Sequence, residues 1–340
     1  MQPARPLGGF GVVGARRPNR RGGIHRRRRS QTEGGGSWGK SVFCGIIPRT
    51  KTTEERVMHI AVIGLGLMGR AIAQRLQCQG LRVTGYNRSP GAPLPGVAIS
   101  QDLAEALAGA EVVWVMLADA AACTAVLCDH GQAAGLAGKT ILNGATIAPA
   151  QSRALATSLT AAGAQYLETP VLGSTPQAQD GSLQILVGGD PAVFAAQEPL
   201  LRLLGVPTHF GAIGQGAAVK LAMNQLIGSL TAAFSMSLGL VQREGVAVAQ
   251  FMDTLRQSAL YAPTFDKKLA RMEARAFVPA NFPLKHLQKD LRLFTEAAAE
   301  RQIDTRLLQT LSQVLDERAR AGHADEDYST LFAQFVPPEG

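Results

Sequence analysis

The stretch that most constrains the fold is an apolar run that ends in a glycine-rich turn. Residues 59–63 read His-Ile-Ala-Val-Ile, and glycines follow at 64, 66 and 69 before a helical pattern that reaches Gln79. Strand, Gly-x-Gly-x-x-Gly and helix in this order are typical of a dinucleotide cradle, because the glycines permit a tight turn, a close approach to the pyrophosphate and helix packing. The N-terminus of the helix then faces the phosphates. We expect the whole turn to bind the cofactor, namely Gly64, Leu65, Gly66, Leu67, Met68 and Gly69.

The end of the next apolar run indicates which dinucleotide binds. Residues 82–86 are followed by Asn87, Arg88 and Ser89, where chains that bind NAD usually place a carboxylate for the ribose 2′-hydroxyl. A carboxylate would repel a 2′-phosphate, whereas Arg88 can pair with one and Asn87 and Ser89 can donate hydrogen bonds to it. These residues therefore predict NADP(H). The alternative is an ordinary solvated turn.

Strand and helix patterns alternate through the first half of the chain. The apolar run Val112–Leu117 is nearly continuous, as in a parallel sheet that is buried on both faces. Expected strands lie at 59–63, 82–86, 111–117, 140–145, 164–170, 184–188 and 207–211, and expected helices include 101–109, 150–162 and 191–203. The predicted fold class is α/β, with an N-terminal Rossmann-type doubly wound sheet followed by an all-α C-terminal domain.

Strand signals stop near residue 213. Helical patterns then occupy 215–243, 247–259, 263–276, 284–301 and 304–321. We expect an NADP-binding Rossmann domain over 58–212 and an all-helical substrate and dimerisation domain over 213–340. The ligand should bind at the carboxyl edge of the sheet, where the helical domain covers it.

The net charge of +8 arises in the N-terminal segment. Residues 1–57 carry 13 basic and three acidic side chains, whereas the remaining residues carry 21 and 23. We expect this glycine-rich segment to be disordered. It could bind a nucleic acid or another polyanion, or be an organelle transit peptide. It could also result from an upstream start assignment, which we favour because Met58 directly precedes the first strand.

The cysteines and the hydropathy narrow the class of protein further. The four cysteines, at 44, 78, 123 and 128, lack the spacing of a metal site, so we expect reduced thiols, a reducing compartment and no metal. No apolar run is long enough to cross a membrane. We expect a cytoplasmic protein, or an organellar one if the basic segment is a transit peptide.

Three segments carry candidate chemistry. Lys220 and Asn224 are four residues apart and share a face of an apolar helix, so Lys220 could donate a proton to a carbonyl that is being reduced; it could equally be a snorkelling lysine. The turn Gly173-Ser174 follows a strand and could hold a carboxylate, or be an ordinary loop. The adjacent pair Lys289 and Asp290 would by itself indicate a solvated surface.

Taken in order, these segments resemble the β-hydroxyacid dehydrogenases, the family of 3-hydroxyisobutyrate dehydrogenase, and within it the glyoxylate and succinic semialdehyde reductases. The resemblance runs from Met58 to about Phe335. It rests on Gly64 to Gly69, Pro170 to Ser174, Gly216 to Asn224, Phe282 to Leu291 and Asp327 to Phe332.

The resemblance implies a role for individual residues. Lys220 matches the catalytic lysine, and Asn224 matches the asparagine that positions the substrate. Thr146 matches a threonine that lies near the nicotinamide and the substrate, and Lys289 matches a lysine that contacts the cofactor, so both are expected to bind the cofactor. Phe282 and Asp290 match residues of the substrate pocket, and the turn Gly173-Ser174 is the expected place for a substrate carboxylate. The resemblance also implies a homodimer or homotetramer.

One departure from the family puts the substrate in doubt. Leu172 stands where the family commonly has a serine that helps to hold the substrate carboxylate, so a hydroxyl is lost and bulk is added. The predicted activity is NADPH-dependent reduction of a small aldehyde or 2-oxo acid. Alternatives are an imine reductase, against which Lys220 argues, and a cofactor-binding protein without turnover.

Overall fold

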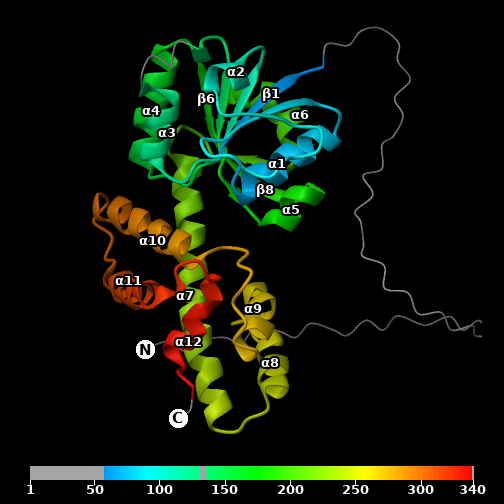
Figure 1. Ribbon diagram of the computed structural model, residues 1–340. Helices are drawn as coiled ribbons and strands as arrows, with labels where there is room; N and C mark the ends of the chain where they lie inside the picture. Colours follow the sequence, from blue (N-terminus) through cyan, green and yellow to red (C-terminus); the bar gives the residue numbers. More distant parts are fainter. Residues whose placement is uncertain (1–56, 130–134, 339–340) are drawn as a thin grey trace, which may run out of the picture. The chain divides into compact units, whose positions relative to one another are not determined.

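The computed structural model describes residues 57–129 and 135–338 (Figure 1). The expectations for the basic segment concern residues outside this range, apart from Val57. The strands of the described part are β1 (His59–Ile63), β2 (Arg82–Tyr86), β3 (Ala98–Ser100), β4 (Val112–Val115), β5 (Thr140–Asn143), β6 (Gln165–Glu168), β7 (Val171–Leu172), β8 (Leu183–Gly189) and β9 (Gly205–His209). They form one sheet in the order β3-β2-β1-β4-β5-β6-β8-β7, with β9 also paired to β8.

The helices around this sheet are α1 (Leu67–Cys78), α2 (Leu103–Leu107), α3 (Ala120–Leu127), α4 (Pro149–Ala161), α5 (Thr175–Asp180) and α6 (Pro191–Leu201). Alternate residues of β1 face two separate cores: Ile60 and Val62 pack in one, and Ala61 and Ile63 in the other. Because both faces are covered, the strand has to be apolar throughout. The predicted α/β class with a Rossmann-type sheet is confirmed.

The sheet departs from a purely parallel arrangement after β6. The strands from β3 to β6 pair in parallel, whereas β8 is antiparallel to both β6 and β7. Residues 173–182 connect β7 to β8, and this link is shorter than the dozen or more residues that a parallel crossover needs. The chain therefore reverses direction, through the short helix α5.

After β9 the described chain is helical. The helices are α7 (Gln215–Arg243), α8 (Val248–Arg256), α9 (Pro263–Glu273), α10 (Leu284–Ala299), α11 (Arg306–Arg318), η2 (Ala319–His323), η3 (Tyr328–Thr330) and α12 (Leu331–Phe335). The start of α7 packs on β8 and α4, and its later turns pack on α10 and α12 (Figure 1). The predicted bounds of the long helix, 215–243, are those observed.

Short elements were missed from the sequence. β3, β7 and α5 have two to six residues each, too few for a periodic pattern to be recognised. Within the described ranges, no helix combines the length and hydropathy that a membrane crossing requires.

Candidate active site

The glycine turn has the geometry expected of a phosphate cradle. Gly64 has a φ of 94°, and a Cβ there would lie 2.5 Å from the carbonyl oxygen of Met116. A Cβ at Gly69 would overlap the carbonyl oxygen of Gly64, so the first turn of α1 presses directly on the glycine turn. At Gly66, by contrast, a Cβ would meet no atom within 4 Å. The backbone is thus open at the point where a pyrophosphate would approach, and these residues fit a dinucleotide.

The end of β2 is tied to this turn by Asn87. Its Oδ1 accepts a hydrogen bond from the backbone N–H of Leu65 at 3.3 Å, and its Nδ2 donates to the carbonyl of Ser89 at 2.8 Å. The amide of Asn87 therefore holds the turn together, while Arg88 and Ser89 are exposed beyond it. Of the three predicted phosphate ligands, Arg88 and Ser89 are exposed, whereas Asn87 is half-buried.

Lys220 lies in the second turn of α7 and is held from two sides. Its Nζ donates to the carbonyl oxygen of Val171 at 2.8 Å and to Oδ1 of Asn224 at 3.1 Å. Burial lowers the pKa of Lys220 to about 8, and the nearby charge of Asp290 limits that fall. An ammonium has three hydrogens, so the contact with Val171 and the contact with Asn224 leave one for a ligand.

A buried carboxylate fixes the orientation of Asn224. Asp290 is 2 % exposed, and its Oδ2 accepts from Nδ2 of Asn224 at 2.6 Å. Its other oxygen lies 3.2 Å from Nζ of Lys289. Because the amide nitrogen of Asn224 must face Asp290, its carbonyl oxygen faces Lys220.

Lys289 joins α10 to the carboxyl edge of the sheet. Its Nζ donates to the carbonyl oxygens of Ala118 and Thr146, each at 2.8 Å. Ala118 follows β4 and Thr146 follows β5, so both lie beyond the carboxyl ends of parallel strands. Lys289 and Asp290, which by themselves resembled a solvated surface pair, are therefore part of the same cluster as Lys220.

In the turn after β7, the side chain that could hold a carboxylate already has a partner within the protein. Gly173 has a φ of 125°, and a Cβ there would lie 2.7 Å from the side chain of Leu183. The backbone N–H and the hydroxyl of Ser174 both donate to Oε1 of Gln177, at 2.9 and 2.7 Å. The Ser174 hydroxyl is therefore held by Gln177 at the start of α5, and it must leave Gln177 to donate to a substrate.

Phe282 is part of an aromatic group at the start of α10. Its ring stacks on His286 with centroids 6.3 Å apart, and it meets the ring of Tyr328 edge-on at 5.8 Å. Burial lowers the pKa of His286. Phe282, His286 and the site residues Lys289 and Asp290 all belong to one short stretch of the chain.

A buried ion pair that the sequence reasoning missed holds this aromatic group. Nζ of Lys268 lies 2.8 and 2.9 Å from the two carboxylate oxygens of Asp327. Asp327 also accepts from the backbone N–H groups of Asn281 and Phe282, at 3.1 and 3.3 Å. The helical pattern of 263–276 contained a signal, because Lys268 falls on its apolar face.

A second missed residue, Glu168, anchors the helix that carries Lys220. Its carboxylate accepts from the backbone N–H of Gly214 at 2.7 Å and of Ala217 at 3.3 Å. Burial raises the pKa of Glu168. A Cβ at Gly188 would collide with this carboxylate. An anion at a helix N-terminus is favourable, so Glu168 ties β6 to the start of α7.

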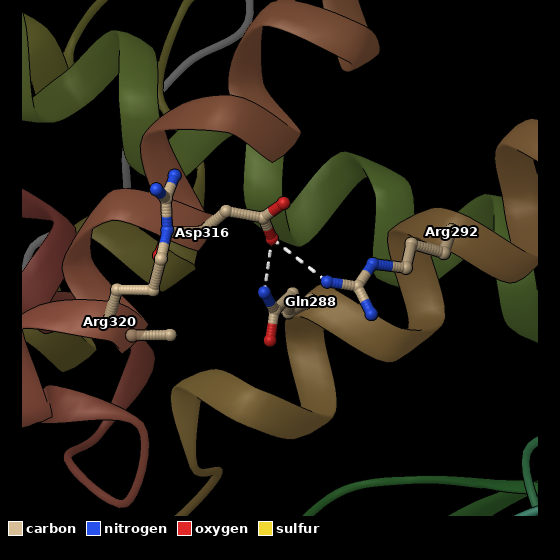
Figure 2. Close-up of a pocket in the computed structure, with 5 residues that line it drawn as sticks. Gln288, Arg292, Asp316 and Arg320 are labelled. Atoms are coloured by element: carbon tan, nitrogen blue, oxygen red, sulfur yellow. Dashed lines mark hydrogen bonds and ion pairs between the residues drawn. The ribbon is translucent and has the colours of Figure 1, made fainter.

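A surface hollow in the helical region is separate from this cluster. Figure 2 shows Asp316 between Gln288, Arg292 and Arg320, and its Oδ1 accepts from Gln288 and, at 3.0 Å, from Arg292. No predicted site residue lines this hollow. In the described ranges, no three His, Cys, Asp or Glu side chains come together as a metal site would require.

Two family models match the chain. The first, for the NAD binding domain of 6-phosphogluconate dehydrogenase, matches residues 59–214. The second, described as NAD-binding of NADP-dependent 3-hydroxyisobutyrate dehydrogenase, matches residues 214–335. Together they cover nearly all of the described residues.

Individual proteins match over the same range. The chain is 31% identical to glyoxylate/succinic semialdehyde reductase 1 of Arabidopsis thaliana over 281 residues, which are 81% of this chain and 97% of that protein. A structure of 3-hydroxyisobutyrate dehydrogenase from Mycobacterium tuberculosis superposes with a TM-score of 0.73 at 25% identity, covering 81% of this chain and 98% of that one. A reductive aminase from Aspergillus terreus in complex with NADPH superposes with a TM-score of 0.55 at 26% identity, covering 82% and 99%.

Proposed function

The chain belongs to the 3-hydroxyisobutyrate dehydrogenase family of NAD(P)-dependent oxidoreductases, and from that premise we propose that it reduces a small aldehyde or 2-oxo acid with NADPH. The observation that carries the proposal is the placement of Lys220. Its ammonium is held by Val171 and Asn224 and lies in one cluster with Lys289, which reaches the sheet edge beside the cofactor turn.

The proposed mechanism assigns proton donation to Lys220. When bound, the nicotinamide supplies a hydride to the carbonyl carbon of the substrate. Negative charge then develops on the carbonyl oxygen, and a positioned ammonium can stabilise that oxygen and donate a proton to it. A pKa of about 8 leaves Lys220 protonated at neutral pH and able to release its proton readily. Asn224 and the Val171 carbonyl keep Nζ in place during the transfer.

The proposed preference for NADPH rests on the end of β2. Arg88 and Ser89 are exposed next to the glycine turn, and no carboxylate stands there to bind a ribose 2′-hydroxyl. An arginine is suited to a phosphate because its N–H groups match the phosphate oxygens. We expect kcat/KM for NADPH to exceed that for NADH by at least about tenfold, and Arg88→Asp to abolish the preference.

The substrate end of the site is proposed to lie between the Gly173 turn and Phe282. Leu172 removes a hydroxyl that relatives use, and the Ser174 hydroxyl is held by Gln177. Both features favour a substrate that is less dependent on carboxylate hydrogen bonds. We therefore expect the aldehyde carbon chain, packed on apolar side chains, to contribute more to binding than a carboxylate does.

A substrate panel tests the proposal. Glyoxylate, succinic semialdehyde, other short aldehydes and cyclic imines are each assayed for oxidation of NADPH and of NADH. We expect turnover of at least one aldehyde or 2-oxo acid, with NADPH preferred. Turnover of imines alone would establish the second candidate, an imine reductase, to which the similarity with the reductive aminase points. Cofactor binding without turnover of any compound would indicate a binding protein.

A further inference from the structure

The backbone of the segment that follows Arg88 and Ser89 makes too few hydrogen bonds of its own to fix its conformation. Residues 90–95 read Pro-Gly-Ala-Pro-Leu-Pro, and proline lacks the backbone N–H that regular structure uses. Between residues 88 and 97, the structure shows one hydrogen bond within the backbone, from the N–H of Val97 to the carbonyl of Leu94 at 3.0 Å. The carbonyl groups of the segment therefore need donors from elsewhere in the molecule.

Side chains of α1 supply these donors. The two terminal nitrogens of Arg70 donate to the adjacent carbonyls of Ala92 and Pro93, at 2.8 and 2.9 Å. One turn further along the helix, Nε2 of Gln74 donates to the carbonyl of Pro95 at 3.3 Å. A rigid planar guanidinium that binds two successive carbonyls fixes both the distance and the direction of the segment.

The turn that carries Arg88 is thus held at both ends. Asn87 ties its start to Leu65 and to Ser89, and Arg70 ties the chain that leaves it. Arg70 follows Gly69 directly, so the clamp and the glycine turn belong to one rigid helix start. The separation between a pyrophosphate at the glycine turn and a 2′-phosphate at Arg88 is therefore fixed before any cofactor binds.

We propose that Arg70 is a positioning residue for cofactor choice, which acts by holding the Arg88–Ser89 turn in place for a 2′-phosphate. The proposal rests on the NADPH preference proposed above. A turn that is already ordered does not lose conformational entropy on binding. Its affinity for the phosphate is therefore higher than that of a mobile turn. NAD lacks the 2′-phosphate, so loss of the clamp should weaken the binding of NADP and leave that of NAD nearly unchanged.

The chain offers a matched control on the same helix. Arg75 also donates to backbone carbonyls, namely those of Leu203 at 3.0 Å and Gln179 at 3.5 Å, but these lie away from the cofactor end of β2. The variants are Arg70→Met, Arg70→Lys and Arg75→Met. Calorimetry gives the Kd of each for NADP⁺, for NAD⁺ and for 2′,5′-ADP, and backbone order parameters from NMR relaxation report on the non-proline residues of 88–97.

We expect Arg70→Met to weaken NADP⁺ and 2′,5′-ADP binding by roughly tenfold, the value of one or two charge-assisted hydrogen bonds, with lower order parameters in residues 88–97. Arg70→Lys should behave like Arg70→Met, because the single Nζ of a lysine replaces two separate nitrogens of a planar group and no longer fixes the direction of the segment. Arg75→Met should leave the ratio of the two cofactor affinities unchanged.

Three outcomes would overturn the proposal. Full NADP⁺ affinity in Arg70→Lys, with residues 88–97 as mobile as in Arg70→Met, would show that Arg70 acts through its charge. Equal weakening of NADP⁺ and NAD⁺ would show a general effect on the fold. Unchanged order parameters in Arg70→Met would show that no clamp exists. An unmodified protein without NADP⁺ preference would instead refute the proposed cofactor choice, while the order parameters would still decide whether Arg70 holds the segment.

Discussion

At Lys220, burial and a neighbouring carboxylate act in opposite directions. Burial removes water from the ammonium and lowers its pKa, while Asp290 favours the charged form, and the resulting pKa is about 8. A lysine at its ordinary pKa would hold its proton too firmly at neutral pH to be an efficient acid. The same contacts that fix the position of Lys220 therefore also adjust its acidity.

Removal of the ammonium should slow the chemical step and leave cofactor binding intact. We expect Lys220→Ala to lower kcat by roughly 10²-fold or more, the usual share of a general acid. The Kd for NADPH, measured by fluorescence titration, should stay near that of the unmodified protein, because the glycine turn is untouched. Activity within a few-fold of the original would exclude Lys220 as the donor and favour His286 or a bound water.

The rate of reduction should depend on pH through Lys220. The donor must be protonated, so kcat/KM for reduction should fall as pH rises through about 8. Asp290→Asn removes the charge that raises the pKa of Lys220. The pH at which kcat/KM falls should therefore be lower in this variant. Asp304→Asn, at an exposed carboxylate paired with Arg306, serves as the control and should leave the profile unchanged. If kcat/KM of Asp290→Asn falls at the same pH as that of the unmodified protein, Asp290 does not influence the pKa of Lys220.

At the scale of elements, the ion pair of Lys268 and Asp327 joins α9 to the start of η3, and Asp327 also holds the backbone of Asn281 and Phe282 just before α10. Burial by itself would raise the pKa of Asp327, but hydrogen bonds and charge from Lys268 and the hydrogen bonds from Ser329 hold it below its ordinary value. Nζ of Lys268 lies 4.4 Å from the Tyr328 ring centre, and Asp327 accepts from the backbone N–H of Phe282. The pair therefore couples the stability of the helical region to the shape of the aromatic group.

Breaking this pair should cost stability and substrate affinity together. Lys268→Met leaves a buried carboxylate without its cation, so the free energy of unfolding should fall by about 3 kcal/mol. The KM for the aldehyde should rise as Phe282 shifts. Urea denaturation and steady-state kinetics measure the two effects. The exposed neighbour Lys267 provides the control, since Lys267→Met should change stability by less than about 0.5 kcal/mol. Equal stability of the two variants would refute a structural role for the pair.

At the scale of the whole molecule, α7 presents apolar side chains that nothing in the described chain covers. Met223, Leu226, Met236 and Leu240 are 39%, 48%, 53% and 63% exposed. Large apolar side chains grouped on one helix are typical of an association surface. We propose that two copies of the chain associate through this helix.

Light scattering tests the proposed dimer. At micromolar concentration we expect a mass of twice the 35.8 kDa of one chain. Leu240→Glu should shift the protein toward the monomer, whereas Leu307→Glu, at a leucine that is 75% exposed outside α7, should not. A monomer in the unmodified protein would rule out the association.

The basic segment is expected to be dispensable for the reaction. All described strands and helices, and every residue of the candidate site, lie after Met58. A chain that begins at Met58 should therefore fold and keep its kcat and KM, as measured beside the full chain. Insolubility or loss of activity would show that the segment belongs to the working protein. Mass spectrometry of the native N-terminus would separate a cleaved presequence from a different start.

The sequence by itself determined those features that depend on residues close together along the chain. The spacing of Gly64, Gly66 and Gly69 predicted the cofactor turn, and apolar periodicity predicted α7 over 215–243, because both depend on residues within a few turns of each other. The pairing of Lys220 with Asn224 likewise followed from a spacing of four residues.

Contacts between distant segments were decided by the tertiary structure alone. Lys289 reaches Ala118 and Thr146 across 171 and 143 residues, and Glu168 caps α7 across 46. No spacing rule connects such partners, because their proximity results from how the sheet and the helices pack. For the same reason the sequence could place Asp290 on a helix but could not show that its carboxylate orients Asn224 toward Lys220.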